Sequence, residues 1–311
     1  MRPIVIATRK SPLALWQADH VAQALRARTG REVELLPLVT EGDRILDAPL
    51  ARIGGKGLFV KEIEQALLDG RADLAVHSLK DVPTALPQGL TLGAILERED
   101  PRDALCAPRH LRLDALPRGT RVGTSSLRRR AQLLALRPDL EVVEIRGNVG
   151  TRLSKVEDEV DAVILARAGL VRLGLAERIT EDLPVERMLP AVGQGALAVE
   201  MRADDAEIAA LVAGLEHPET RDAVRAERAL LARLEGGCQI PLAAHATVEG
   251  DRLRLEARLG RPDGSSLLAA RAEGVRDEAE AIGVRVAEDL LARGAAEILA
   301  ELVGRSVGVP H

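Results

Sequence analysis

Two segments of this chain place arginines just after an apolar run, where a helical pattern begins. In segment 121–130 (RVGTSSLRRR), residues 124–126 can cap a helix, and the free N–H groups at a helix start attract an anion. Arg128 and Arg129 then fall in the first turn, where positive charge opposes the helix dipole. We therefore expect both arginines to face an anion, with a solvated basic helix face as the alternative.

The same design recurs in segment 144–152 (EIRGNVGTR). Its glycines form a loop, Thr151 is expected to cap the next helix, and Arg146 and Arg152 flank the loop. Because parallel strands end at the same edge of a sheet, both loops are expected to line one crevice. Two such loops indicate a ligand with several carboxylates or phosphates. A Walker motif or a GxGxxG fingerprint would favour a nucleotide, and neither appears in register.

The N-terminal part of the chain carries two further glycine-rich or basic junctions. Segment 7–12 (ATRKSP) also leads from a strand to a helix and adds Arg9 and Ser11. Segment 54–59 (GGKGLF) is a glycine loop that bears Lys56. Glycine loops of this kind often serve as mobile lids over a site.

Lys80 and Asp81 stand where a buried strand is expected to end, in segment 77–83 (HSLKDVP). An Asp81 carboxylate among so many cations would stay ionised, and it could stabilise a cationic intermediate or shuttle a proton. A structural salt bridge with Lys80 is the alternative, which the spacing alone favours. His77 fits a hydrogen-bonded core residue better than a base.

The chain has only two cysteines, and each needs a reason. Cys106 lies among small apolar neighbours that suit an inert buried thiol. Cys238 follows a glycine pair that should end a helix, in a loop where backbone can approach a ligand. The C-terminal end of a helix disfavours a thiolate, which argues against a nucleophilic role for Cys238. Gln194, at an expected crossing between lobes, either touches the ligand or stiffens a hinge.

The composition excludes several classes of protein. The net charge is −5, tyrosine is absent, and there is one Phe and one Trp, so stacking on nucleic acid is implausible. No apolar run approaches the length of a membrane span. Six histidines form no spaced pair for a metal. Two distant cysteines give no disulfide framework, which favours a reducing cytoplasm.

Short apolar runs alternate with helical patterns through most of the chain, which is typical of α/β layers. Strands are expected at 4–8, 33–39, 74–78, 121–123, 141–145, 162–166 and 195–200, and helices at 11–28, 56–69, 127–136 and 151–156. From about residue 218, a helix, three strands with hairpin turns and two helices indicate an α+β domain. We expect domain 1 at 1–98 with 195–215, domain 2 at 99–194 and domain 3 at 216–311.

Taken together, these segments resemble the porphobilinogen deaminase (hydroxymethylbilane synthase) family. The resemblance spans the chain in order, through segments 7–14, 54–59, 77–83, 123–129, 146–152, 190–196 and 237–238. It implies an α/β fold of two lobes like those of periplasmic binding proteins, with a smaller α+β C-terminal domain. It also implies a transferase of tetrapyrrole (heme) biosynthesis, which condenses four porphobilinogen units head to tail with release of ammonia.

The resemblance further implies roles for individual residues. A dipyrromethane cofactor would be joined to Cys238 by a thioether, and Asp81 would be the catalytic aspartate that stabilises cationic pyrrole intermediates. Each pyrrole carries an acetate and a propionate, which would be the partners of the arginines. Expected cofactor contacts are Ser78, Lys80, Asp81, Thr124, Ser125, Ser126, Arg128, Arg129, Arg146, Gly147 and Gly169. Expected substrate contacts are Arg9, Ser11, Phe59, Arg146, Arg152, Arg172 and Gln194, while Lys56 and Arg52 would belong to an active-site loop.

Two positions depart from the family pattern, and two other functions stay open. Arg52 stands where many relatives have lysine, and Arg167 where an apolar residue is usual. The expected partner is porphobilinogen alone, without nucleic acid or membrane, for a cytoplasmic monomer. The alternatives are a non-catalytic two-lobed binder of a polycarboxylate and a transferase that acts on a phosphate ligand.

Overall fold

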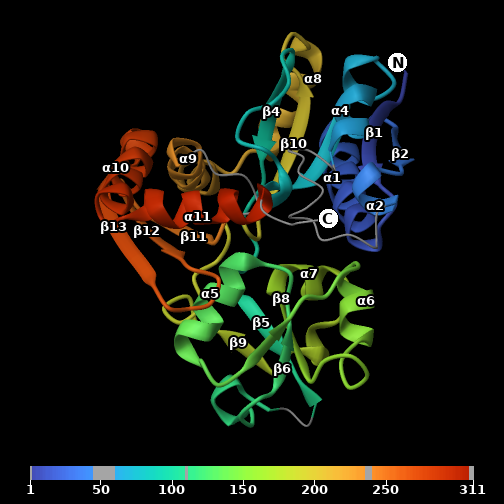
Figure 1. The fold of residues 1–311 in the computed structure, drawn as a ribbon. Helices are drawn as coiled ribbons and strands as arrows, with labels where there is room; N and C mark the ends of the chain where they lie inside the picture. Colours follow the sequence, from blue (N-terminus) through green and yellow to red (C-terminus); the bar gives the residue numbers. More distant parts are fainter. Residues whose placement is uncertain (1, 45–59, 109–110, 235–239, 308–311) are drawn as a thin grey trace. The chain divides into compact units, whose positions relative to one another are not determined.

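The computed structural model describes residues 2–44, 60–108, 111–234 and 240–307 (Figure 1). These residues form two compact units. The first contains the described residues of 2–99 together with 195–221, and the second contains those of 100–194 and 222–307. Within the described ranges, every helix is too short or too polar to span a membrane. The division into three domains stays a prediction.

The first unit is built on a five-stranded mixed sheet in the order β2-β1-β3-β10-β4. Its strands are β1 (Ile4–Arg9), β2 (Val33–Leu38), β3 (Leu74–Ser78), β4 (Leu90–Ile95) and β10 (Leu197–Arg202). Its helices are α1 (Pro12–Thr29), α2 (Glu41–Arg44), α4 (Lys61–Leu68) and α8 (Ala206–Val212). Strands β1, β2 and β3 are parallel, whereas β10 runs antiparallel to β3 and β4. The expectation that the strand after residue 195 rejoins the first lobe is confirmed.

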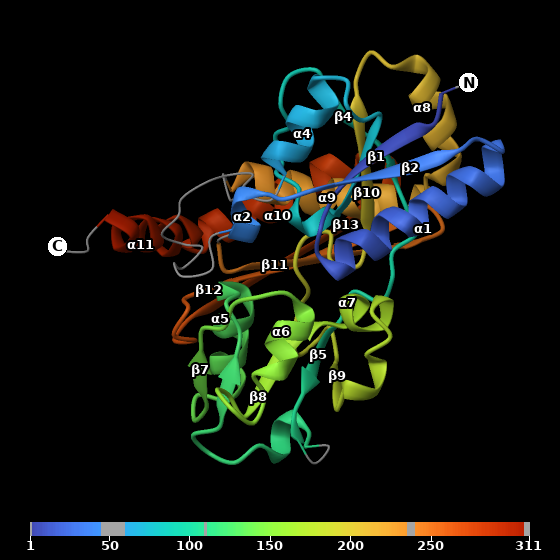
Figure 2. The same cartoon turned by 90° about the vertical axis from the view of Figure 1, so that its right-hand side faces the viewer.

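Helix α1 shows why the sequence folds as it does in this unit. Ser11 is the N-cap and accepts a hydrogen bond from the Ala14 N–H, and Pro12 follows at the first helical position. Gly30 ends the helix in the left-handed conformation, at φ 65°. Apolar residues of α1 and α8 pack on one face of the sheet and those of α4 pack on the other. Figure 2 shows α1 lying along β1 and β2.

The second unit contains a five-stranded sheet in the order β7-β6-β8-β5-β9. Its strands are β5 (Asp103–Cys106), β6 (Arg121–Gly123), β7 (Glu141–Val143), β8 (Ala162–Ala166) and β9 (Glu181–Leu183). Its helices are α5 (Leu127–Leu136), α6 (Val149–Ser154) and α7 (Arg167–Arg172). Strands β7, β6 and β8 are parallel, and β5 is antiparallel to β8 and β9. Helix α5 packs on one face and helices α6 and α7 on the other.

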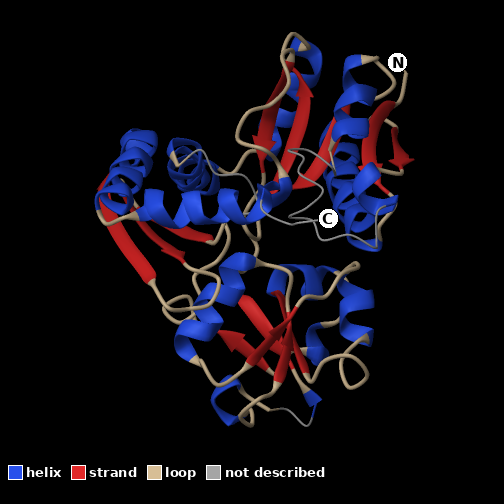
Figure 3. Ribbon diagram, in the orientation of Figure 1, coloured by secondary structure: helices blue, strands red, loops and turns tan. Residues whose placement is uncertain are grey.

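The same unit contains an antiparallel three-stranded sheet, as the sequence predicted. Its strands are β11 (Leu242–Glu249), β12 (Arg252–Gly260) and β13 (Leu267–Val275), and its helices are α9 (Pro218–Arg233), α10 (Ala279–Ala292) and α11 (Ala295–Val307). Apolar side chains of the three helices cover one face of this sheet. Figure 3 shows the strands of this sheet and its three helices coloured by secondary structure.

Three strands were not expected from the sequence, namely β4, β5 and β9. Strand β5 begins at Asp103, shortly after the chain passes into the second unit at Asp100. Strands β5 and β9 have four and three residues, and neither sequence, DALC or EDL, alternates apolar with polar residues. Their hydrogen bonds to neighbouring strands, rather than local propensity, define them.

Candidate functional site

In the first unit, functional candidates gather where parallel strands β1 and β3 end. Arg9 is the last residue of β1 and is half-buried, and Ser11 caps α1 two residues later. Ser78 is the last residue of β3, and its Oγ accepts a hydrogen bond of 2.8 Å from Gln17 Nε2. This bond ties the end of β3 to helix α1. The structure therefore brings Arg9, Ser11 and Ser78 to one edge of the sheet.

Asp81 lies just beyond this edge, in a single 3-10 turn formed by Leu79–Asp81. Leu79 is buried and anchors the turn, Lys80 is half-buried, and Asp81 is exposed. Among the described residues, no hydrogen bond or ion pair engages the Asp81 carboxylate. The structural salt bridge with Lys80, which the spacing had favoured, is therefore not formed. Asp81 presents a carboxylate to solvent at the end of a rigid, buried strand.

His77 belongs to a buried polar cluster behind this edge. Its Nε2 lies 2.9 Å from Glu200 Oε2 on β10, which confirms a hydrogen-bonded core histidine. Glu64 of α4 is 9% exposed, and burial together with the nearby Glu200 charge raises its pKa to about 7. The sequence analysis identified neither glutamate.

In the second unit, the candidates follow three adjacent parallel strands. Residues 124–126 follow β6, Arg146 and Gly147 follow β7, and α7 with Gly169 and Arg172 follows β8. Gly169 is buried, whereas Arg146 and Arg172 are half-buried. The expectation that the loops after β6 and β7 share one sheet edge is confirmed, because the two strands are parallel neighbours.

Helix α5 begins as the sequence predicted. Ser126 is its N-cap and accepts from the Arg129 N–H, while Thr124 Oγ1 accepts from the Ser126 N–H. Ser125 is half-buried between them. Arg128 and Arg129 are only 4% and 5% exposed, so the alternative of a solvated basic face is wrong.

The anion that these arginines face is a side chain of the protein itself. Asp103 Oδ2 lies 2.7 Å from Arg128 Nη1, and Asp103 Oδ1 accepts from Arg129 Nε and Nη2 at 3.1 and 2.8 Å. Burial alone would raise the pKa of Asp103, but the charges and hydrogen bonds of the two arginines outweigh it and lower that pKa. The sequence did not indicate a role for Asp103, because strand β5, which it begins, was not predicted.

Arg128 and Arg129 differ in how many of their guanidinium nitrogens already donate a hydrogen bond within the protein. Arg129 uses Nη1 as well, in a bond of 2.9 Å to the Ile164 carbonyl. Arg128 uses only Nη1, which also donates to the Leu189 carbonyl at 2.7 Å. Its Nε and Nη2 donate to no other residue that the structure describes. A guanidinium that is nine-tenths buried and keeps two donor groups is suited to a carboxylate of a ligand.

The loop after β7 is organised by a residue that the sequence analysis did not choose. Asn148, not Thr151, is the N-cap of α6, and its Oδ1 accepts from the Thr151 N–H at 2.9 Å. Asn competes well for this position because its short amide reaches the free N–H groups. Gly147 has φ 111°, and Arg152 Nε donates to its carbonyl at 2.8 Å. This bond fixes Arg152 against the loop.

Gln194 and Arg167 are both bound within the second unit. Gln194 is 1% exposed, and its Nε2 donates to the Pro101 carbonyl and to Asp103 Oδ1 at 2.7 and 2.9 Å. Arg167, the unexpected charge, pairs with Asp100 and Asp182. The departure at Arg167 is thus compensated by two carboxylates.

Several expected site residues lie outside the described residues. They are Arg52, Lys56, Phe59 and Cys238. Cys106 is described: it is buried in β5, and burial raises the pKa of its thiol to about 12. It therefore fits the inert thiol that the sequence predicted.

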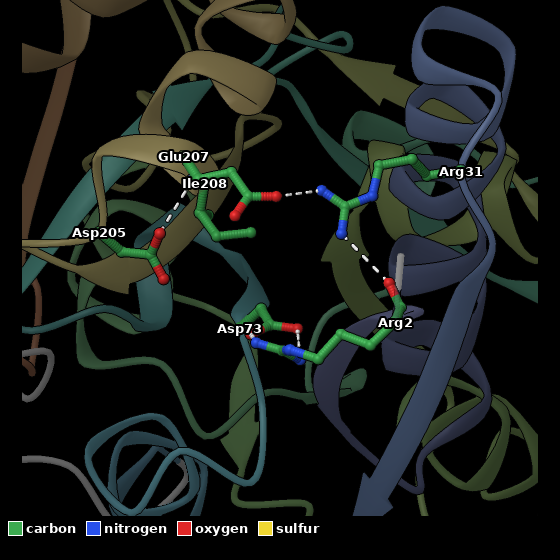
Figure 4. Close-up of a pocket in the computed structure, with 6 residues that line it drawn as sticks. All are labelled: Arg2, Arg31, Asp73, Asp205, Glu207 and Ile208. Carbon is green, nitrogen blue, oxygen red and sulfur yellow. Dashed lines mark hydrogen bonds and ion pairs between the residues drawn. The ribbon is translucent and has the colours of Figure 1, made fainter.

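A polar pocket of the first unit is a separate feature (Figure 4). It is lined by Arg2, Arg31, Asp73, Asp205, Glu207 and Ile208. Arg2 binds Asp73 through two hydrogen bonds, and Arg31 pairs with Glu207. Arg2 and Asp73 precede β1 and β3, so the pocket lies at the edge of the sheet opposite to Asp81. We assign it to ion pairing that stabilises the fold.

Comparisons with known proteins fit this geometry. A family model described as "Porphobilinogen deaminase, dipyromethane cofactor binding domain" matches residues 4–210, and "Porphobilinogen deaminase, C-terminal domain" matches residues 222–292. Solved structures with some similarity include the periplasmic VFT2 domain of Bordetella pertussis BvgS, at 17% identity and a TM-score of 0.40, covering 68% of this chain and 85% of that one. The methionine binding protein MetQ has 15% identity and a TM-score of 0.43, covering 68% of this chain and 89% of that one. These structural likenesses are distant.

Proposed function

Because the chain belongs to the porphobilinogen deaminase family, we propose that the strand ends described above hold the cofactor and substrate of a hydroxymethylbilane synthase. The family condenses porphobilinogen in tetrapyrrole biosynthesis, and its N-terminal model is a dipyrromethane cofactor-binding domain. The cofactor, when bound, supplies the pyrrole carbon to which the first substrate unit is joined. The protein's part is to bind carboxylates and to stabilise positive charge.

One observation carries this proposal, namely the buried Arg128 with its two remaining donor groups. A dipyrromethane bears acetate and propionate groups, which match a guanidinium in charge and geometry. Arg146, Arg152 and Arg172 follow the neighbouring strands at the same edge and would bind further carboxylates. Ser78, Lys80, Thr124, Ser125, Ser126, Arg129, Gly147 and Gly169 would complete the cofactor contacts, and Arg9, Ser11, Phe59 and Gln194 those of the substrate.

Asp81 would be the catalytic residue. Its exposed carboxylate has no described partner, so it is available to a pyrrole nitrogen. An anion there offsets the positive charge that develops when ammonia leaves, and the rigid end of β3 holds it in place before reaction. Lys56 and Arg52 would belong to an active-site loop.

We also propose where the cofactor is attached and in which compartment the protein works. The cofactor would be joined to Cys238 by a thioether, while Cys106 is excluded by its burial and raised pKa. We further propose that the protein works as a monomer in the reducing cytoplasm, with porphobilinogen as its only partner.

The intact mass of the protein tests this function. The purified protein, incubated with porphobilinogen, should exceed its 33.3 kDa sequence mass by one dipyrromethane unit. Cys238→Ser should abolish the excess, whereas Cys106→Ala, the control at the buried thiol, should keep it. An unmodified wild-type chain after this incubation would overturn the proposal and favour a non-catalytic binder of polycarboxylates.

A further inference from the structure

Asp103 is the centre of a buried polar cluster at the arginine-bearing edge of the second unit. It is fully buried at the start of β5 and lies opposite Ala166, the last residue of β8, in the antiparallel ladder. Its two carboxylate oxygens accept four hydrogen bonds, from Arg128, Arg129 and Gln194. All three of these donors are proposed contacts of cofactor or substrate, but Asp103 is not.

The charges of this cluster do not cancel. Two buried guanidinium groups face a single carboxylate, so the cluster keeps a net charge of about +1. Burying two arginines without Asp103 would be strongly unfavourable, because each would lose its hydration without a compensating charge. Asp103 therefore makes a buried positive site possible and leaves one charge for a ligand anion.

The hydrogen bonds also fix orientation. Arg128 Nη1 is held between Asp103 Oδ2 and the Leu189 carbonyl, each at 2.7 Å. Gln132 donates to the same carbonyl at 3.0 Å and accepts from the Leu189 N–H at 2.9 Å, which fixes that carbonyl. Arg128 Nη1 is thus held by two acceptors, while Nε and Nη2 donate to no described residue.

We propose that Asp103 is a positioning residue for the reaction, which orients Arg128 so that Nε and Nη2 bind a cofactor or substrate carboxylate. The division of roles follows from the contacts: every guanidinium nitrogen of Arg129 donates to Asp103 or to the Ile164 carbonyl, so Arg129 supports the cluster, while Arg128 meets the ligand. This inference rests on the proposed function, because it takes the ligand to be the carboxylate-rich dipyrromethane or its substrate.

The test uses Asp103→Asn, which keeps the size of the side chain and removes its charge. Glu181→Gln is the matched control, since Glu181 is also a buried carboxylate of this sheet and accepts from Arg112 and the Leu113 N–H, away from Arg128. Three measurements are made: the cofactor-loaded fraction by intact mass, side-chain N–H signals by NMR in the cofactor-free protein, and KM and kcat of the protein that loads. The signals are assigned with Arg128→Lys and Arg129→Lys.

For Asp103→Asn we expect the Arg128 and Arg129 Nε–H signals to shift and broaden, and the loaded fraction to fall at least tenfold. The protein that does load should show a KM for porphobilinogen raised tenfold or more, with kcat within threefold. Glu181→Gln should behave like wild type in all three measurements. A stability loss alone would not produce this split between KM and kcat.

The double variant Asp103→Asn with Arg129→Gln restores the net charge of the cluster but not its geometry. It also leaves fewer uncompensated buried charges, so it should fold even where the single variant does not. We expect it to load as poorly as Asp103→Asn. Normal loading would mean that net charge suffices and would overturn the positioning role, as would unchanged arginine signals in Asp103→Asn. A wild-type chain that never gains cofactor mass would instead overturn the proposed function.

Discussion

At the scale of single residues, side chains of one type have different roles because their surroundings differ. Arg128 and Arg129 are adjacent in the sequence and both buried, yet only Arg128 has guanidinium nitrogens that donate to no described residue. Cys106 is sealed in a strand, which keeps its thiol protonated. Asp81, in contrast, is an exposed carboxylate at the end of a buried strand.

The role of Asp81 is tested by Asp81→Asn. We expect the variant to gain the cofactor mass normally and to lose at least a hundredfold in kcat, because the amide cannot offset developing positive charge. Steady-state kinetics on the loaded protein measure this. Asp69→Asn, which changes an exposed aspartate after α4, should stay within twofold of wild type. Near-normal turnover in Asp81→Asn would refute the assigned role.

At the scale of elements, helix α5 is supported by the hairpin of β12 and β13. Gly264, in the turn between these strands, has φ 75° and lies so close to α5 that a Cβ atom would sit 2.6 Å from the Ala135 nitrogen. Arg130 Nε donates to the Pro262 carbonyl in the same turn. The hairpin thus fixes the helix whose first turn carries Arg128.

Two glycine substitutions separate this packing from backbone strain. Gly250, in the turn between β11 and β12, has φ 58°, and no atom lies within 4 Å of the position that a Cβ would take. Gly250→Ala should therefore lower the free energy of unfolding by about 1 kcal/mol, from backbone strain alone. Gly264→Ala would add the clash of the new Cβ with α5 to the same kind of backbone strain. It should therefore lower the free energy of unfolding by about 3 kcal/mol. Urea unfolding of both variants measures the difference. Equal costs would show that the contact with α5 contributes nothing to stability.

At the scale of the whole molecule, the buried carboxylates of Asp103 and Glu64 make the free energy of unfolding depend on pH in opposite directions. The pKa of Asp103 is lowered from 3.8, so the stability that it contributes is present above that pH and is lost as the pH falls below it. Glu64 has a pKa raised to about 7, under the influence of its burial and of Glu200. Between the unfolded pKa of about 4.5 and pH 7 the native state holds a proton that the unfolded state releases, so stability falls as pH rises.

Glu64→Gln should remove this loss. We expect the variant to match wild type at pH 5 and to be more stable by about 2 kcal/mol at pH 8, where native Glu64 must ionise beside Glu200. Urea unfolding followed by the fluorescence of Trp16, the only tryptophan, reports on the unit that contains Glu64. A pH-independent difference between the two proteins would contradict the raised pKa.

Local sequence signals predicted much of the fold. Ser11 with Pro12, and Ser126 at the start of α5, mark helix starts because capping depends on neighbours within three or four residues. The order of strands and helices followed from hydrophobic periodicity, and the ends of α5 were predicted to the residue. Strands β5 and β9 were not predicted, because neither of their short sequences alternates apolar with polar residues.

The sequence by itself determined most of the elements, the family resemblance and which residue types stand at most of the strand ends. Only the tertiary structure decided which charges are satisfied internally. Asp103 lies 25 residues from Arg128 in the chain, and Glu200 lies 123 from His77, so no local pattern joins them. Burial strengthens such long-range ion pairs and makes a buried charge without a partner costly. For this reason, the anion that the sequence predicted near Arg128 and Arg129 is in part the carboxylate of Asp103.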